Sequence, residues 1–204
     1  MKILVRAWVW AWVGILAVPV GASSQTIDGG EITYARKVFL FGPVDAEQAR
    51  EVVESLLELD AIDPGREIDL LINSTGGNVG AARSILSAFE MISSPVNTVC
   101  MGYAWSSAAT ILAGGTGQRQ AYEHTSVMIH ELSWEDAGLI RELEATARQG
   151  RRDNDIEISL LSKFSGRSVE VIAGDMVSDH YLSATEARTY GLIDTVLPLA
   201  ERKH

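Results

Sequence analysis

The chain has 204 residues, of which 47% are hydrophobic and 22% charged, so it is long enough for one domain with a sizeable core. Its formal net charge of −10 argues against nucleic acid as the main partner, because binding to phosphates requires a basic surface. The single cysteine, Cys100, excludes an internal disulfide, and its apolar neighbours predict a buried thiol.

Residues 1–22 have the layout of a secretory signal peptide. Lys2 and Arg6 precede an uncharged apolar run, which ends in small residues and is followed by polar ones. The run is shorter than the ~20 residues that span a bilayer, which favours cleavage and a periplasmic or secreted mature protein. An uncleaved anchor facing the periplasm stays open. Residues 23–36 then form a short polar lead to a single domain, residues 37–204.

Strands and helices alternate along the domain. Apolar runs predict strands at 37–41, 68–72 and 96–100, and each is followed by a helical pattern that begins after Asp45, after Asn78 and at Ser107. This alternation predicts an α/β fold with a mainly parallel sheet. Shorter strands are expected at 119–122, 126–129 and 192–197.

Two further helical regions follow. The segment 135–164 is long, charged and weakly amphipathic, with an interruption at Gly150, so it either projects into solvent or packs against a partner. A short helix is expected at 169–175. Ser183 and Glu186 form a capping box for a last helix, which Gly191 ends.

Ser106 stands at the turn between the third strand and its helix. Unpaired N–H groups at a helix N-terminus favour developing negative charge, so a nucleophilic serine would be stabilised there. The same position is also where a serine serves as an ordinary helix N-cap. From this stretch alone, both interpretations stay open.

A nucleophilic serine needs a base, an acid that orients the base, and N–H donors for the oxyanion. His130 ends an apolar strand, a place that structural histidines also occupy, whereas His124 lies among polar residues and His180 precedes the last helix. Asp175 and Asp179 are the candidate acids in the same region. The pair at 76–77 is a candidate oxyanion site, because glycine lets the backbone approach a substrate closely.

Four segments then form one pattern, at residues 72–77, 100–108, 127–130 and 179–187. Their order and spacing resemble the Clp protease proteolytic subunit (ClpP) family of serine peptidases, over about residues 37–198. The resemblance implies that Ser106 is the nucleophile, His130 the general base and Asp179 the orienting acid. It also implies that the N–H groups of Gly77 and Ser107 form the oxyanion hole.

The resemblance further implies a crotonase/ClpP-like spiral of β-α-β units, with residues 135–164 as a protruding handle helix. The expected assembly is a homo-oligomer built from heptameric rings, and no metal or organic cofactor is implied. Substrates would be peptides or unfolded proteins.

Several residues depart from the family pattern. Near the site, Thr75 replaces a usual proline and Ser107 a usual methionine, and neither change removes an N–H donor. His130 is followed by Glu131-Leu132, where glutamine-proline is usual, so a second carboxylate lies beside the base. His180 replaces an arginine that often follows the acid.

Asp69 and Leu71 stand where tyrosines often help to form the docking pocket for a Clp ATPase. With the short lead, this predicts a secreted or periplasmic endopeptidase that works without a Clp ATPase. Two alternatives stay open: a ring-forming scaffold with a degenerate triad, and a membrane-anchored serine peptidase of the same superfold, which would often use a lysine base.

Overall fold

The computed structural model describes residues 26–27, 30–31, 36–133, 137 and 139–199. It separates into two units, 1–35 and 36–204. In the first unit, β1 (Thr26–Ile27) pairs antiparallel with β2 (Gly30–Glu31). The predicted signal peptide lies outside the described residues. Arg36, at the start of the second unit, donates to the carbonyl oxygens of Leu59 and Glu67 at 2.8 and 2.9 Å and so anchors that start.

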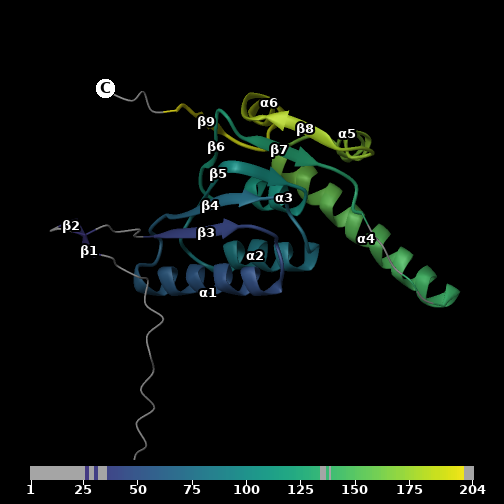
Figure 1. Cartoon of the computed structure of the whole chain (residues 1–204), viewed down its shortest axis with the longest axis horizontal. Coiled ribbons are helices and arrows are strands. Elements are labelled where there is room, and N and C mark those ends of the chain that lie inside the picture. Colours follow the sequence, from purple (N-terminus) through teal and green to yellow (C-terminus); the bar gives the residue numbers. More distant parts are fainter. Residues whose placement is uncertain (1–25, 28–29, 32–35, 134–136, 138, 200–204) are drawn as a thin grey trace, which may run out of the picture. The chain divides into compact units, whose positions relative to one another are not determined.

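The second unit is built on a mainly parallel sheet, which confirms the predicted α/β class (Figure 1). The parallel strands are, in spatial order, β3 (Lys37–Phe41), β4 (Ile68–Ser74), β5 (Val96–Trp105), β6 (Arg119–Tyr122) and β9 (Thr195–Leu197). The second half of β5 also pairs in parallel with β7 (Ser126–Ile129), and β7 pairs antiparallel with β8 (His180–Ser183).

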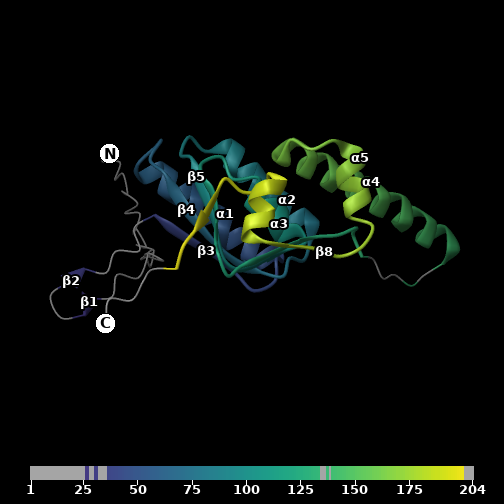
Figure 2. The same cartoon turned by 90° about the horizontal axis from the view of Figure 1, so that it is seen from above.

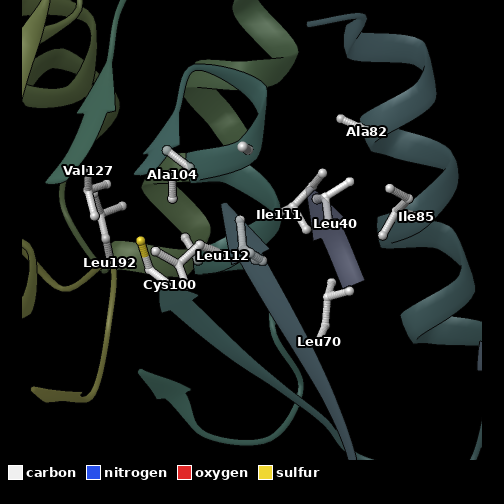
Figure 3. Packing of buried hydrophobic residues seen from close by; sticks show 14 of the residues in the cluster. Leu40, Leu70, Ala82, Ile85, Cys100, Ala104, Ile111, Leu112, Val127 and Leu192 are labelled. Atoms are coloured by element: carbon white, nitrogen blue, oxygen red, sulfur yellow. The ribbon is translucent and has the colours of Figure 1, made fainter. Parts of the chain in front are cut away.

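Helices α1 (Ala46–Ile62), α2 (Val79–Met91) and α3 (Ser107–Ala113) cover one face of this sheet. Alternate residues of β4 point to that face and are buried, as expected for a strand of which one face is covered by helices. Figure 3 shows the resulting core, in which Leu40 and Leu70 from the strands lie near Ile85 of α2 and Ile111 of α3. Asp45 and Asn78 cap α1 and α2, as the sequence predicts for Asp45.

The remaining helices are α4 (Ile140–Ser165), α5 (Val169–Asp175) and α6 (Ala184–Tyr190). Only the second half of α4 packs on the core, through Ile158 and Leu161, and its first half extends away from the sheet (Figures 1 and 2). The predicted interruption at Gly150 is wrong, because one glycine costs about 1 kcal/mol and does not break a helix of good helix formers. The predicted start at 135 falls among residues outside the described ranges.

The strand β5 is longer than predicted, since it runs on through residues 101–105. Pairing of Tyr103 and Trp105 with β7 supplies the ladder for this extension, and a local run of residues does not reveal such a partner. The last strand is shorter than predicted and begins at Thr195. No helix among the described residues is long and apolar enough to cross a membrane.

The sheet face opposite α1 to α3 carries exposed aromatic and apolar side chains. We call these residues the aromatic face: Phe39, Phe41, Met101, Tyr103 and Tyr181. Phe39 and Phe41 make an edge-to-face contact, and Trp105 lies between Tyr103 and Tyr181 at ring-centroid distances of 4.4 and 5.5 Å. An exposed apolar patch of this kind typically marks an interaction surface.

Candidate active site

Ser106 lies between the end of β5 and the start of α3, as the sequence predicts. Its backbone has φ 56° and ψ −129°, a conformation that residues with a Cβ rarely adopt. Its N–H donates to the carbonyl oxygen of Met128 at 2.8 Å, which fixes the turn against β7. Its side chain makes no capping hydrogen bond, although it occupies the N-cap position. The hydroxyl is therefore not used as an N-cap, which was the alternative interpretation.

His130 directly follows β7, and its imidazole faces the serine. Its Nε2 atom lies 2.9 Å from the Oγ of Ser106. In the tautomer that carries the proton on Nδ1, Nε2 accepts the hydrogen bond from the hydroxyl, which is the arrangement a general base requires. The imidazole is largely buried, with 21% of its side chain exposed. Its neighbour Glu131 is exposed and forms no ion pair among the described residues.

Asp179 directly precedes β8, the strand that pairs with β7. Its Oδ1 is 3.7 Å from the Nδ1 of His130, a separation longer than a hydrogen bond. Its side chain is 55% exposed, and its Oδ2 accepts a hydrogen bond from the hydroxyl of Tyr181 at 3.3 Å. Asp175, the other candidate acid, ends α5 and accepts a hydrogen bond from Tyr190 at 2.7 Å. Of the two aspartates, only Asp179 faces the imidazole.

Gly76 packs directly against the serine turn, and Gly77 packs against Val44. A Cβ on Gly76 would come within 2.5 Å of the Trp105 carbonyl oxygen, and one on Gly77 would collide with the Val44 carbonyl. The two glycines also have φ values of 85° and 151°, which L side chains rarely adopt. Glycine is therefore needed at position 76 for the loop to lie against the serine turn, and at position 77 for it to lie against Val44.

Two N–H groups at this junction are available to a ligand. The N–H of Ser107 opens α3 and has no partner within the helix. Among the described residues, the N–H of Gly77 makes no hydrogen bond, whereas that of Gly76 donates to Ser74 Oγ at 3.1 Å. Gly77 and Ser107 are the pair that the resemblance implies for the oxyanion hole; Ser107 follows Ser106 in the chain, and Gly77 follows Gly76, which packs against Ser106.

The other candidate residues lie away from the serine. His124 is exposed in the turn between β6 and β7, and His180 begins β8 with its ring 5.7 Å from that of Tyr190. Among the described residues, the lysines are Lys37, which pairs with Asp69 at 3.2 Å, and Lys163, whose nitrogen lies 5.7 Å from the Phe164 ring. Neither contacts Ser106, which weakens the alternative with a lysine base.

Sequence reasoning missed a group of polar side chains next to the serine. A small cavity of about 10 Å³ opens onto Ser106 and His130, and its lining includes the Glu157 side chain. Glu157 belongs to α4, a helix with many charged residues, so nothing local in the sequence indicates that this one carboxylate is buried. The available indication was its spacing of four residues from Leu161, which places both on one helix face.

Comparison with known proteins agrees with this geometry. The family model described as Clp protease matches residues 22–199, a range that includes every residue that the structure describes. The match takes in the strand–turn–helix that carries Ser106, the strand that ends at His130 and the loop that holds Asp179. The chain therefore belongs to the Clp protease family.

Proposed function

We propose that this chain is a serine endopeptidase that cleaves peptides and unfolded proteins. The observation that carries the proposal is the distance of 2.9 Å between Ser106 Oγ and His130 Nε2, at a turn with free N–H groups. Ser106 attacks the peptide carbonyl while His130 takes its proton, and the N–H groups of Gly77 and Ser107 hold the oxyanion.

The same groups complete the cycle. His130 returns its proton to the departing amine, which leaves an ester between the acyl part of the substrate and Ser106. Water then attacks the ester, with His130 again as the base, and releases the acid and the free serine. Asp179 favours the imidazolium that forms in each half of the cycle, through its charge and its position beside Nδ1.

The test is labelling of the purified protein by a fluorophosphonate, together with hydrolysis of a fluorogenic peptide. We expect wild type to be labelled at Ser106 and Ser106→Ala to lose labelling and several orders of magnitude of activity, while it keeps its assembly. Ser107→Ala keeps its N–H and should retain labelling. Labelling that persists in Ser106→Ala but is lost in Ser107→Ala would overturn the assignment. Absence of labelling in wild type would favour a degenerate scaffold.

We also propose that the protein assembles into rings of about seven subunits, as members of this family generally form oligomeric rings. The aromatic face is an exposed apolar surface on one side of the sheet, and the first half of α4 is a second exposed surface. Native mass spectrometry should show the mass of one heptameric ring or of two stacked heptameric rings. Only monomer over a micromolar concentration range would overturn this assembly.

We propose, third, that the protein acts outside the cytoplasm and without a Clp ATPase. The signal-like residues 1–22 support export, and Asp69 at the usual docking position is charged. Asp69 pairs with Lys37 and accepts a hydrogen bond from Asn97 at 3.0 Å, so an apolar docking peptide would have to displace both. ATP-dependent degradation of a folded substrate, after addition of a cytoplasmic Clp ATPase, would overturn the proposal. Degradation of unfolded casein alone, unchanged by ATP, would support it.

A further inference from the structure

The cavity next to Ser106 and His130 has two kinds of wall. Apolar residues of the lining come from β7, the loop after it, α4 and the end of α5: Ile129, Leu132, Leu161 and Met176. Polar residues of the lining come from α3 and α4: Ser107, Thr110 and Glu157. Its volume of about 10 Å³ is near the minimum that holds one water molecule.

Glu157 is a carboxylate buried in this wall, with 3% of its surface exposed. Its Oε2 accepts a short hydrogen bond of 2.8 Å from the hydroxyl of Thr110. Its Oε1 has only long contacts, 3.4 and 3.5 Å from the Nε and Nη2 of Arg83. Because a carboxylate oxygen can accept two hydrogen bonds, Oε1 retains an unused acceptor site.

The charges around Glu157 do not balance. Arg83 also holds Asp153, with Nη1 2.6 Å from Oδ1, so one guanidinium serves two carboxylates. That hydrogen bond lowers the pKa of Asp153, whereas burial raises the pKa of Glu157. When both are ionised, the cluster carries an excess negative charge, and Glu157 is the member that lines the cavity.

Ser107 supplies an unsatisfied polar atom in the lining of the same cavity. The residue is 2% exposed, and its Oγ makes no hydrogen bond within the described part of the chain. Buried polar groups are nearly always paired, and leaving one unpaired is costly. The cavity therefore offers an unused acceptor on Glu157 and a hydroxyl on Ser107 that can donate.

We propose that this cavity is the specificity pocket for the substrate residue whose carbonyl Ser106 attacks, here called the acyl residue, and that it selects serine or threonine. A hydroxyl is the smallest group that both donates and accepts, so it can donate to Glu157 Oε1 and accept from Ser107 Oγ. Valine, which has the shape of threonine, can bond to neither group and leaves the Ser107 hydroxyl unpaired, and the small volume disfavours leucine. The proposal rests on the peptidase function proposed above.

The experiment compares five fluorogenic peptides that differ only in the acyl residue, which is serine, alanine, threonine, valine or leucine. We expect wild type to cleave the threonine peptide with kcat/KM about 10- to 100-fold above that for valine, because sites built for a hydrogen bond reject analogues that lack it. The serine peptide should exceed the alanine peptide similarly, and leucine should be cleaved most slowly.

Two variants assign the preference to its residues. Glu157→Gln keeps the size and removes the charge, and Ser107→Ala removes the hydroxyl but keeps the N–H. Each should lower the threonine-to-valine ratio at least fivefold, about 1 kcal/mol at RT ≈ 0.59 kcal/mol, which is within the range of one net hydrogen bond. Glu144→Gln, the same change at an exposed position of α4, should leave the ratio unchanged. Fluorophosphonate labelling of each variant shows whether Ser106 and its surroundings are intact.

The outcomes are separable. A wild type that cleaves valine as fast as threonine, or leucine fastest, would overturn the pocket assignment while the peptidase function stands. The pocket assignment would also be overturned if the threonine-to-valine ratio were unchanged in both variants while both were still labelled. It would be overturned as well if wild type were labelled but cleaved none of the five peptides. Failure of both labelling and cleavage would overturn the proposed function and this inference with it.

Discussion

The backbone at Ser106 offers a test that is independent of substrate. Its φ of 56° with ψ of −129° is a conformation that suits glycine and strains a residue with a Cβ. We compare Ser106→Ala with Ser106→Gly. Both variants lose the hydroxyl and its contact with His130, so a difference between them reports the backbone alone. We expect the glycine variant to be the more stable of the two.

The magnitude follows from two opposing effects. A residue with a Cβ in such a region costs about 1–3 kcal/mol, which glycine avoids. Glycine also has greater freedom in the unfolded chain, which destabilises its variant by about 0.4–1 kcal/mol. The net expectation is a free energy of unfolding about 1 kcal/mol higher for Ser106→Gly. For a domain of 150–250 residues this corresponds to a Tm difference of about 2–4 °C.

The assay is urea and thermal unfolding of the two variants, followed by circular dichroism. Both are measured at the same protein concentration, since the apparent stability of an oligomer depends on it. Equal slopes of the urea transitions would show that the variants unfold over the same surface. If Ser106→Gly were equal to or less stable than Ser106→Ala, the turn would not be strained, and the φ-based account of Ser106 would be refuted.

Two further variants test the surroundings of the site and the fold. Gly76→Ala should lower both stability and activity, because its Cβ would lie 2.5 Å from the Trp105 carbonyl oxygen, whereas Gly174→Ala meets no atom within 4 Å and serves as the control in unfolding and peptide assays. Arg119 lowers the pKa of Asp194 by hydrogen bonding to its carboxylate. The ionised carboxylate therefore stabilises the fold above the unfolded pKa of about 3.9, and this stabilisation is lost as the pH falls through the folded pKa. Asp194→Asn should therefore be less stable at pH 7, and urea unfolding should show the difference shrinking below about pH 4.

The main strands and helices were predictable because their periodicity and end residues are local. Residues of β4 alternate in burial, and Gly191 adopts a φ of 98° at the end of α6 as a C-cap glycine does. The strand β8 was not predictable. It has only four residues, with Tyr181 exposed, and it exists because β7 lies antiparallel to it. Such pairing is a tertiary property, which no local pattern encodes.

The residues of the site likewise fall into those that the sequence identified and those that it did not. Ser106, His130 and Asp179 were selected by four sequence blocks, and the structure brings the three together. Glu157 and Arg83 were not selected, because each lies in a helix where a charged residue is ordinarily solvated. Their meeting, 74 positions apart in the chain, depends on how α2 and α4 pack. Long-range polar contacts of this kind follow from packing and not from spacing.

The last prediction concerns how much the acid contributes. Asp179 lies 3.7 Å from His130 Nδ1, is half exposed, and is held on its other oxygen by Tyr181. The bond from Ser106 to His130 is already formed at 2.9 Å without a close acid. We therefore expect Asp179→Asn to lower kcat/KM by about 10- to 100-fold, or ~1.4–2.7 kcal/mol, clearly less than Ser106→Ala.

The contribution of Asp179 to catalysis is limited by its exposure, because solvent screens the interaction of its charge with the imidazolium. High salt should therefore lower the activity of wild type and leave Asp179→Asn nearly unaffected. Tyr181→Phe keeps the ring on Trp105 but frees the carboxylate, so its kcat should fall a fewfold while KM stays constant. Steady-state kinetics of wild type, Asp179→Asn and Tyr181→Phe at two ionic strengths test these expectations. If Asp179→Asn lost as much activity as Ser106→Ala, the acid would have to close on His130 when substrate binds, and the loose geometry would not describe the working enzyme.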